Sequence, residues 1–126
     1  MTDFESLGLS DAVLKSIEQL GFTTPTPIQA QVIPAVLSGS ADLIALAQTG
    51  TGKTAAFGLP LVDMIDTSAR QPLALILAPT RELCVQIEND LRNFAKNTRG
   101  FSSVAVYGGS SIRAQIDSIR KGVQVV

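Results

Sequence analysis

Apolar positions in the first forty residues recur with the spacing of helices. The sequence predicts one helix that Ser10 caps and that ends at Gly21, because glycine readily adopts the left-handed conformation wanted there. Its apolar face consists of Val13, Leu14, Ile17 and Leu20. A second helix is predicted after the cap residue Thr26, with a proline at its first position, where a missing N–H costs nothing. Pro34 predicts a kink, or a break into two short pieces, near Ile33.

From residue 41 onward the pattern changes to short apolar runs that alternate with helical stretches. The runs cover residues 43–47, 73–78 and 103–107, and a fourth run opens at Val123. Helices are predicted over 53–66, where Pro60 weakens the pattern, and along two stripes of apolar residues: Leu83, Ile87, Leu91 and Phe94, then Ile112, Ile116 and Ile119. Such alternation is typical of βαβ units, so the predicted fold class is α/β with a parallel sheet and flanking helices.

The predicted strands end at residues that suit ligand binding. In open parallel sheets ligands bind at the carboxyl ends of the strands, which here are residues 47–49, 79–81 and 108–109. We interpret residues 1–126 as a single domain, with N-terminal helices over 1–40 and βα units over 41–126. The sequence stops inside an apolar run, which predicts a fragment truncated at its C-terminal side.

Composition narrows the possible chemistry. The chain has 126 residues, is 45% hydrophobic, and carries a formal net charge of −1, so any nucleic-acid contact would have to come from a few placed groups rather than a basic face. It has no histidine and only one cysteine, Cys84, which excludes a disulfide, a His-based triad and a thiolate zinc cluster. The start lacks the pattern of a signal peptide, and the longest aliphatic run, 73–78, is too short to span a bilayer. We therefore expect no membrane contact and a cytoplasmic location.

Residues 47–54, Ala-Gln-Thr-Gly-Thr-Gly-Lys-Thr, form a predicted phosphate loop between a strand and a helix. Gly50 and Gly52 allow backbone N–H groups to surround phosphate oxygens, and the start of the following helix adds its positive dipole end. Lys53 is placed to reach the β- and γ-phosphates, and the Thr54 hydroxyl to ligate Mg²⁺. The binding loop would comprise Thr49, Gly50, Thr51, Gly52, Lys53 and Thr54. The strict pattern has glycine where this chain has Ala47, a position that needs only a small residue.

A dinucleotide-binding loop is the alternative interpretation of the same glycines. Residues 50–55 fit the glycine fingerprint with alanine in the last place. That fingerprint requires an acidic residue at the end of the second strand, about 20 positions on. The second strand here ends in Ala78, Pro79 and Thr80, so the dinucleotide interpretation is the weaker one.

Four segments together resemble the DEAD-box RNA helicase family. Residues 21–29, Gly-Phe-Thr-Thr-Pro-Thr-Pro-Ile-Gln, resemble its Q motif, and residues 47–54 resemble its motif I, which commonly begins with alanine. Residues 79–83, Pro-Thr-Arg-Glu-Leu, resemble motif Ia, and Gly108-Gly109 resembles the GG motif. The resemblance covers nearly the whole chain and implies the N-terminal part of the first RecA-like domain, with a P-loop NTPase fold that binds ATP or ADP and Mg²⁺.

The resemblance also implies roles for residues around the adenine base. Gln29 would present its amide to the adenine edge, which offers the complementary acceptor and donor. Phe4 matches an upstream aromatic that packs on the adenine ring, although a core anchor is an equally good interpretation. Phe22 and Thr24 would line the same pocket, and Thr26 would cap its helix and tie the Q motif to the phosphate loop.

Six further residues would, by resemblance, contact the RNA sugar-phosphate backbone. They are Pro79, Thr80, Arg81, Glu82, Gly108 and Gly109. Small residues and exposed N–H groups suit the approach of a phosphate, and Arg81 supplies charge. Thr80 is also a predicted helix N-cap, and an ion pair on the surface is the alternative role for Arg81.

Parts of the family's machinery are not found in this sequence. The Asp-Glu-Ala-Asp carboxylates that support hydrolysis are missing, and the acids Asp63, Asp66, Asp90 and Asp117 fall on predicted helices. The remainder of the first domain and the second RecA-like domain are also missing. We therefore expect these residues to bind adenine nucleotide without hydrolysing it or unwinding RNA. The rival hypothesis is a non-catalytic adenine-nucleotide-binding module, and a small-molecule P-loop kinase is disfavoured because the Q-motif segment would have no role.

Overall fold

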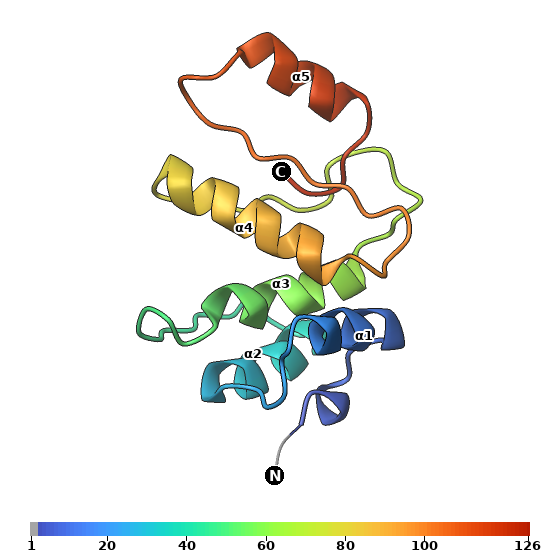
Figure 1. Ribbon diagram of the computed structural model, residues 1–126, viewed down its shortest axis with the longest axis vertical. Coiled ribbons are helices and arrows are strands. Elements are labelled where there is room, and N and C mark those ends of the chain that lie inside the picture. Colours follow the sequence, from blue (N-terminus) through green and yellow to red (C-terminus); the bar gives the residue numbers. More distant parts are fainter. Residues whose placement is uncertain (1–2) are drawn as a thin grey trace.

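The computed structural model describes residues 3–126 and contains six helical elements. In chain order they are the short 3₁₀ helix η1 (Glu5–Leu7), α1 (Asp11–Gln19), α2 (Pro27–Ser38), α3 (Lys53–Met64), α4 (Arg81–Phe94) and α5 (Ile112–Arg120) (Figure 1). All the helices predicted from the sequence are therefore present. Asp66 is a small exception, because α3 ends at Met64 and Asp66 lies in the turn that follows.

The helix ends largely follow the predicted cap residues. Thr26 and Gln29 form a capping box at the start of α2: the Thr26 hydroxyl accepts from the Gln29 N–H, and the Gln29 side chain accepts from the Thr26 N–H at 2.9 Å. Gly21, just beyond α1, has a left-handed φ of 81°. Ser10 does precede α1, but its side chain makes no capping hydrogen bond.

The predicted break at Pro34 does not occur. Helix α2 runs without interruption from Pro27 to Ser38 with Pro34 inside it. A proline in a helix interior removes one backbone hydrogen bond, yet the ring itself stays on the exposed side. Val32 and Ile33 are buried just before it, and α2 packs extensively on α3. Tertiary packing on the opposite face therefore holds the helix together through the proline.

Three extended segments pair in parallel. The central one, 123–126, bonds on one side to 73–76, where the Ile76 N–H donates to the Val126 carbonyl at 2.9 Å. On its other side it bonds to 102–104, where the Val104 N–H donates to the Val125 carbonyl at 3.1 Å. Both bridges, from Ala74 and from Ser103 to Val125, are parallel. The parallel arrangement predicted from the apolar runs is confirmed, although each pairing is short.

The run at 43–47 does not form the predicted strand. In the described part of the chain it has no β-bridge, and Ile44 and Leu46 are each 90% exposed. A strand is defined by hydrogen bonds to a neighbour, so an apolar run without a paired neighbour stays an extended segment. Its backbone nevertheless leads directly into the phosphate loop.

The helices lie on both sides of the paired segments. Figure 1 shows α5 on one side and α4 and α3 on the other, with α1 and α2 beyond α3. The core lies on the α3 and α4 side, where Leu59, Leu91 and Val125 are at most 2% exposed. Helix α5 contributes no buried residue, so the apolar stripe that predicted it is mostly exposed. Among the described helices none has the length and apolar character needed to cross a membrane.

Candidate functional site

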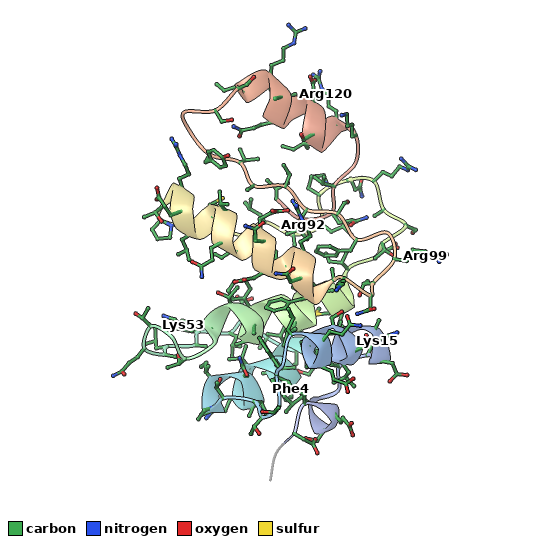
Figure 2. All side chains as sticks on the ribbon, viewed as in Figure 1. Phe4, Lys15, Lys53, Arg92, Arg99 and Arg120 are labelled. Carbon is green, nitrogen blue, oxygen red and sulfur yellow. The ribbon has the colours of Figure 1, made fainter. Side chains whose placement is uncertain are left out.

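The phosphate loop has the backbone conformation that the glycine pattern predicts. Gly50 and Gly52 adopt left-handed φ values of 79° and 85°, which side chains disfavour, and Gly52 is the N-cap of α3. Lys53 and Thr54 are the first two residues of α3, and Figure 2 shows Lys53 beside the loop. Lys53 is exposed and Thr54 is half-buried. Left-handed glycines that lead into a helix start with an available ammonium group fit the phosphates of a nucleotide.

Gln29 ties the Q-motif segment to this loop. Its side chain is buried, with 4% exposed, and its Nε2 donates to the Gly52 carbonyl at 3.3 Å while its Oε1 accepts from the Thr26 N–H. A Cβ placed at Gly52 would collide with the Gln29 amide. Gly52 is therefore required both by its φ and by the close approach of Gln29.

A second group of predicted residues meets around the turn at 107–109. Thr80 caps α4, since its hydroxyl accepts from the Leu83 N–H at 3.2 Å. The Arg81 Nη2 donates to the Gly108 carbonyl at 2.7 Å, and its guanidinium carbon lies 5.3 Å from the centre of the Tyr107 ring. Within residues 3–126 Arg81 makes no ion pair, so the alternative of a surface salt bridge is not observed. The segments resembling motif Ia and the GG motif are thus joined in space.

These residues line an open hollow on the surface. Its walls include Pro79, Thr80, Arg81, Tyr107 and Gly108, with Leu75 and Leu77 beside them. Glu82 is exposed at the start of α4 and does not line the hollow, and Gly109 lies against the Arg81 guanidinium.

Comparison with known proteins decides the family. The sequence profile of the DEAD/DEAH box helicases matches residues 26–126. The chain belongs to this family. The resemblance found in the Q-motif, phosphate-loop, Pro-Thr-Arg-Glu-Leu and Gly-Gly segments is confirmed.

Relatives with sequences similar to nearly the whole of this DEAD-box chain support the family assignment. It is 47% identical over 125 residues to the ATP-dependent RNA helicase DeaD of Klebsiella pneumoniae, covering 99% of this chain and 19% of that protein. It is 47% identical over 126 residues to the DEAD-box ATP-dependent RNA helicase CshA of Bacillus cereus, covering 100% of this chain and 24% of that protein. The chain thus spans about a fifth to a quarter of the length of these relatives.

Solved structures confirm the RecA-like α/β fold. A DEAD box protein from the hyperthermophile Methanococcus jannaschii superposes with a TM-score of 0.93 at 36% identity, covering 100% of this chain and 34% of that one. The RNA helicase Prp28 from Chaetomium thermophilum, bound to ADP, gives a TM-score of 0.82 at 41% identity, covering 99% of this chain and 31% of that one. The fold class predicted from the alternation of apolar runs and helices is therefore confirmed.

The phosphate loop of this DEAD-box chain opens into a cleft with residues that sequence reasoning missed. The cleft runs from Gly50, Gly52 and Lys53 past Gln29 and Phe22 to α4, where Gln86, Asp90 and Asn93 line its wall. Those three residues are spaced i, i+4 and i+7, which places them on one polar stripe of α4. From the sequence, this spacing could have predicted that the three residues share one face of a helix. It could not have predicted that this face lines the cleft beside the phosphate loop. Burial raises the pKa of the Asp90 carboxyl above its ordinary value.

Two predicted aromatic residues lie at different depths. Phe22 lines the cleft, and its ring lies 6.2 Å from that of Phe94 in an edge-on arrangement. Phe4 is 5% exposed and lies behind Phe22, with ring centres 6.1 Å apart, where it does not line the cleft. The packing of Phe4 fits the core-anchor interpretation. Thr24 is exposed and does not line the cleft either.

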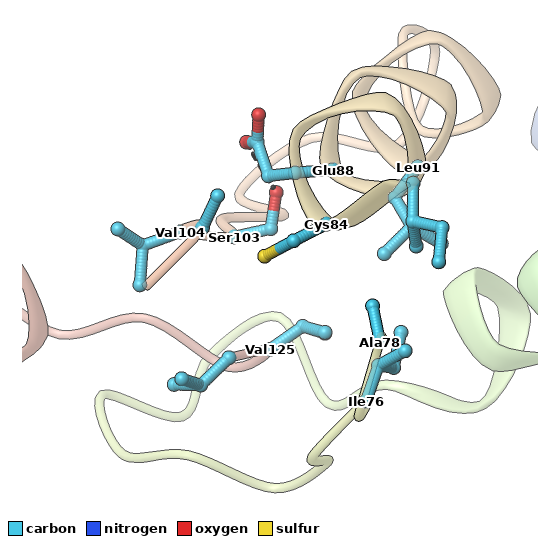
Figure 3. Close-up of a pocket in the computed structure, with 11 residues that line it drawn as sticks. Ile76, Ala78, Cys84, Glu88, Leu91, Ser103, Val104 and Val125 are labelled. Carbon is cyan, nitrogen blue, oxygen red and sulfur yellow. Dashed lines mark hydrogen bonds between the residues drawn. The ribbon is translucent and has the colours of Figure 1, made fainter. Parts of the chain in front are cut away.

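A small apolar cavity lies between α4 and the paired segments, and its polar side chains bond to one another within the protein. Its lining includes Ile76, Leu91 and Val125, with Cys84 at one side (Figure 3). Glu88 and Ser103 point toward each other there, and the Ser103 hydroxyl donates to the Glu88 carboxylate at 2.9 Å. The Arg92 guanidinium donates to the same carboxylate oxygen at 2.6 Å. The buried carboxylate is thus satisfied by its own protein neighbours.

Proposed function

We propose that this chain forms the ATP-binding part of an ATP-dependent RNA helicase. The observation that carries the proposal is the phosphate loop, in which two left-handed glycines precede Lys53 and Thr54 at the start of α3 and Gln29 bonds to the loop from the Q-motif segment. Support comes from relatives named as ATP-dependent RNA helicases. Unwinding of RNA duplexes would be an activity of the whole protein, and we propose it on the basis of family membership.

The nucleotide would bind with its phosphates at the loop. Lys53 would contact the β- and γ-phosphates, and the Thr54 hydroxyl would ligate a Mg²⁺ ion held with ATP. A bound Mg²⁺ would neutralise developing phosphate charge. The other loop residues, Thr49, Gly50, Thr51 and Gly52, would surround the phosphates with backbone N–H groups.

Gln29 retains the hydrogen-bonding capacity to read adenine. A side-chain amide has two donor hydrogens and two acceptor lone pairs, and the bonds to Thr26 and Gly52 use one of each. One donor and one acceptor remain, which is what the N7 and N6 edge of adenine requires. Phe22 lines the cleft and is placed to contact the base, while Phe4 would support it from the core.

RNA would contact the hollow lined by residues 79–81 and Gly108, together with the adjacent Glu82 and Gly109. The two glycines bring backbone close to the surface, and Arg81 contributes positive charge beside them. The net charge of −1 offers no broad basic face, so we infer a weak affinity of the chain alone for RNA.

Binding without turnover is the proposed behaviour of these 126 residues on their own. The loop supplies Lys53 and Thr54, but the family's Asp-Glu-Ala-Asp carboxylates are missing from these residues. Asp90 is the carboxylate that lines the described cleft, and it lies on helix α4 rather than at the end of a strand. The second candidate function is therefore a non-catalytic adenine-nucleotide-binding module, which predicts the same binding but no role in RNA unwinding by the longer protein.

Calorimetry on the chain tests the proposal. ADP with Mg²⁺ is expected to bind, and Lys53→Ala should weaken binding at least tenfold, because one charge-assisted phosphate contact is worth about 1.5–3 kcal/mol. Gln29→Ala should weaken ADP binding and leave GDP binding, weak in both proteins, unchanged. If GDP binds the wild-type chain as well as ADP does, the adenine-reading role of Gln29 is wrong, and if Lys53→Ala binds ADP normally, the phosphate-loop assignment is wrong.

A further inference from the structure

Gln115, on α5, holds both backbone groups of Tyr107. The Tyr107 N–H donates to the Gln115 Oε1 at 3.1 Å, and the Gln115 Nε2 donates to the Tyr107 carbonyl at 2.9 Å. The amide side chain thus pairs with the peptide as a neighbouring strand would. Tyr107 is the residue directly before Gly108, so this pair of bonds fixes the point where the Gly-Gly turn begins.

Arg81 holds the same turn from the opposite side. Its guanidinium donates to the Gly108 carbonyl at 2.7 Å and lies over the Tyr107 ring. Gly109 has a φ of 81°, and a Cβ there would collide with the guanidinium. The turn at 107–109 is therefore fastened to α4 through Arg81 and to α5 through Gln115.

Helix α5 has little else to hold it in place. It contributes no buried residue, and Ile112 is 74% exposed. Hydrophobic packing of α5 is thus weak, and the two amide bonds are its well-defined connection to the turn. Two adjacent glycines lose more backbone freedom on ordering than other residues, so a turn that is already fixed has a smaller entropic cost when a ligand binds.

From these contacts we propose that Gln115 is a positioning residue for RNA binding at the Gly108-Gly109 turn. The inference rests on the proposed RNA contact of that turn. Gln115 does not touch RNA itself: it keeps the Tyr107 peptide in place, so that the exposed backbone of the two glycines and the Arg81 charge face one phosphate group together.

The test compares Gln115→Met with the wild-type chain and with Ser118→Ala. Methionine keeps the length of the side chain and removes both hydrogen bonds, whereas Ser118 lies on the same helix and bonds only within it, to the Ala114 carbonyl. The probe is fluorescein-labelled decauridylate, measured by fluorescence anisotropy at low salt. Gln115→Met is expected to bind about two- to tenfold more weakly, as the loss of one or two modest hydrogen bonds implies. Ser118→Ala should match wild type.

Three further readouts separate positioning from a general structural role. ADP affinity of Gln115→Met should stay at the wild-type value, its melting temperature should fall by only a few degrees, as the loss of two hydrogen bonds implies, and the amide NMR signals of Gly108 and Gly109 should respond less to RNA. Equal losses of RNA and ADP binding, or a large fall in melting temperature, would overturn the inference. If Gln115→Met binds RNA as tightly as wild type does, the positioning role of Gln115 is wrong but the proposed RNA contact of the turn stands. If the wild-type chain itself binds no RNA, both the proposed RNA contact and the positioning role are wrong.

Discussion

The side-chain amide of Gln29 donates a hydrogen bond to the carbonyl oxygen of Gly52 at 3.3 Å, across 23 residues of sequence. The same amide completes the capping box of α2 through the Thr26 N–H. A single side chain therefore connects the start of the second helix with the start of the third. Any change in the position of α2 is transmitted to the backbone that would surround the phosphates.

Gly52→Ala should impair the chain more than Gly50→Ala. Both glycines have left-handed φ values, so alanine at either costs about 1–2 kcal/mol of backbone strain. Only at Gly52 would the new Cβ also meet the Gln29 amide, whereas the space at Gly50 is open. Urea unfolding should show the larger loss for Gly52→Ala, and calorimetry should show the weaker ADP binding.

The double variant Gly52→Ala with Gln29→Ala provides the control for that prediction. Removing the amide relieves the collision, so the two changes should cost less stability together than the sum of the single changes. Strict additivity would show that Gln29 and Gly52 do not interact.

Thr80→Ala should lower the free energy of unfolding by about 1 kcal/mol, the usual loss for an N-cap hydroxyl. The Thr80 hydroxyl accepts from the Leu83 N–H, so its removal leaves a helix donor without its partner. Ser10→Ala is the matched control, because Ser10 is an N-cap without a side-chain capping bond. Denaturant unfolding that gives equal losses for both variants would contradict the capping role.

Gln124→Leu should be among the most damaging single changes, with a loss of about 2–4 kcal/mol. Gln124 is 2% exposed, and the two hydrogens of its Nε2 are shared among the carbonyls of Thr67, Ala69 and Gly100. Leucine would leave these carbonyl oxygens without this donor. The same change at the exposed Gln31 is expected to have little effect, and thermal unfolding of the two variants provides the comparison.

Asp90→Asn should raise the melting temperature slightly at pH 7. Burial raises the pKa of the Asp90 carboxyl, so the native state holds that proton more tightly than the unfolded chain does. The stability contributed by Asp90 therefore falls as pH rises from the unfolded pKa through the higher native pKa, and asparagine removes this dependence.

The difference between Asp90→Asn and wild type should disappear below about pH 3, where the carboxyl is protonated in both states. Asp117→Asn, on the exposed side of α5, serves as the control for the removal of one charge. A wild-type chain that is more stable than Asp90→Asn at pH 7 would contradict the assigned cause.

The parts that sequence predicted well are those determined by neighbouring residues. The Gly50 and Gly52 conformations, the caps at Thr26 and Thr80 and the helices all follow from local patterns. The break at Pro34, one of the two predicted alternatives, does not occur, because packing against α3 outweighs the local effect of the proline.

The site features that sequence did not predict depend on partners far away in the chain. No local pattern indicates that Asp90 lines the phosphate-loop cleft, or that Gln115 bonds to the Tyr107 backbone. The run at 43–47 has the composition of a strand, yet pairing requires a neighbour that composition cannot supply. The family motifs nevertheless located the phosphate loop and the Gly-Gly turn, because their spacing is characteristic.

The central position of residues 123–126 has a consequence for how the protein assembles during synthesis. These residues are synthesised after both of their partners, yet they join 73–76 to 102–104. The two earlier segments have no direct bridge to each other in the described structure. They therefore stay unpaired, with apolar side chains exposed to solvent, until residues 123–126 have been synthesised. During that interval the central segments of the nascent chain would be unpaired. This is the stage at which a chaperone that binds exposed apolar segments would have its greatest effect.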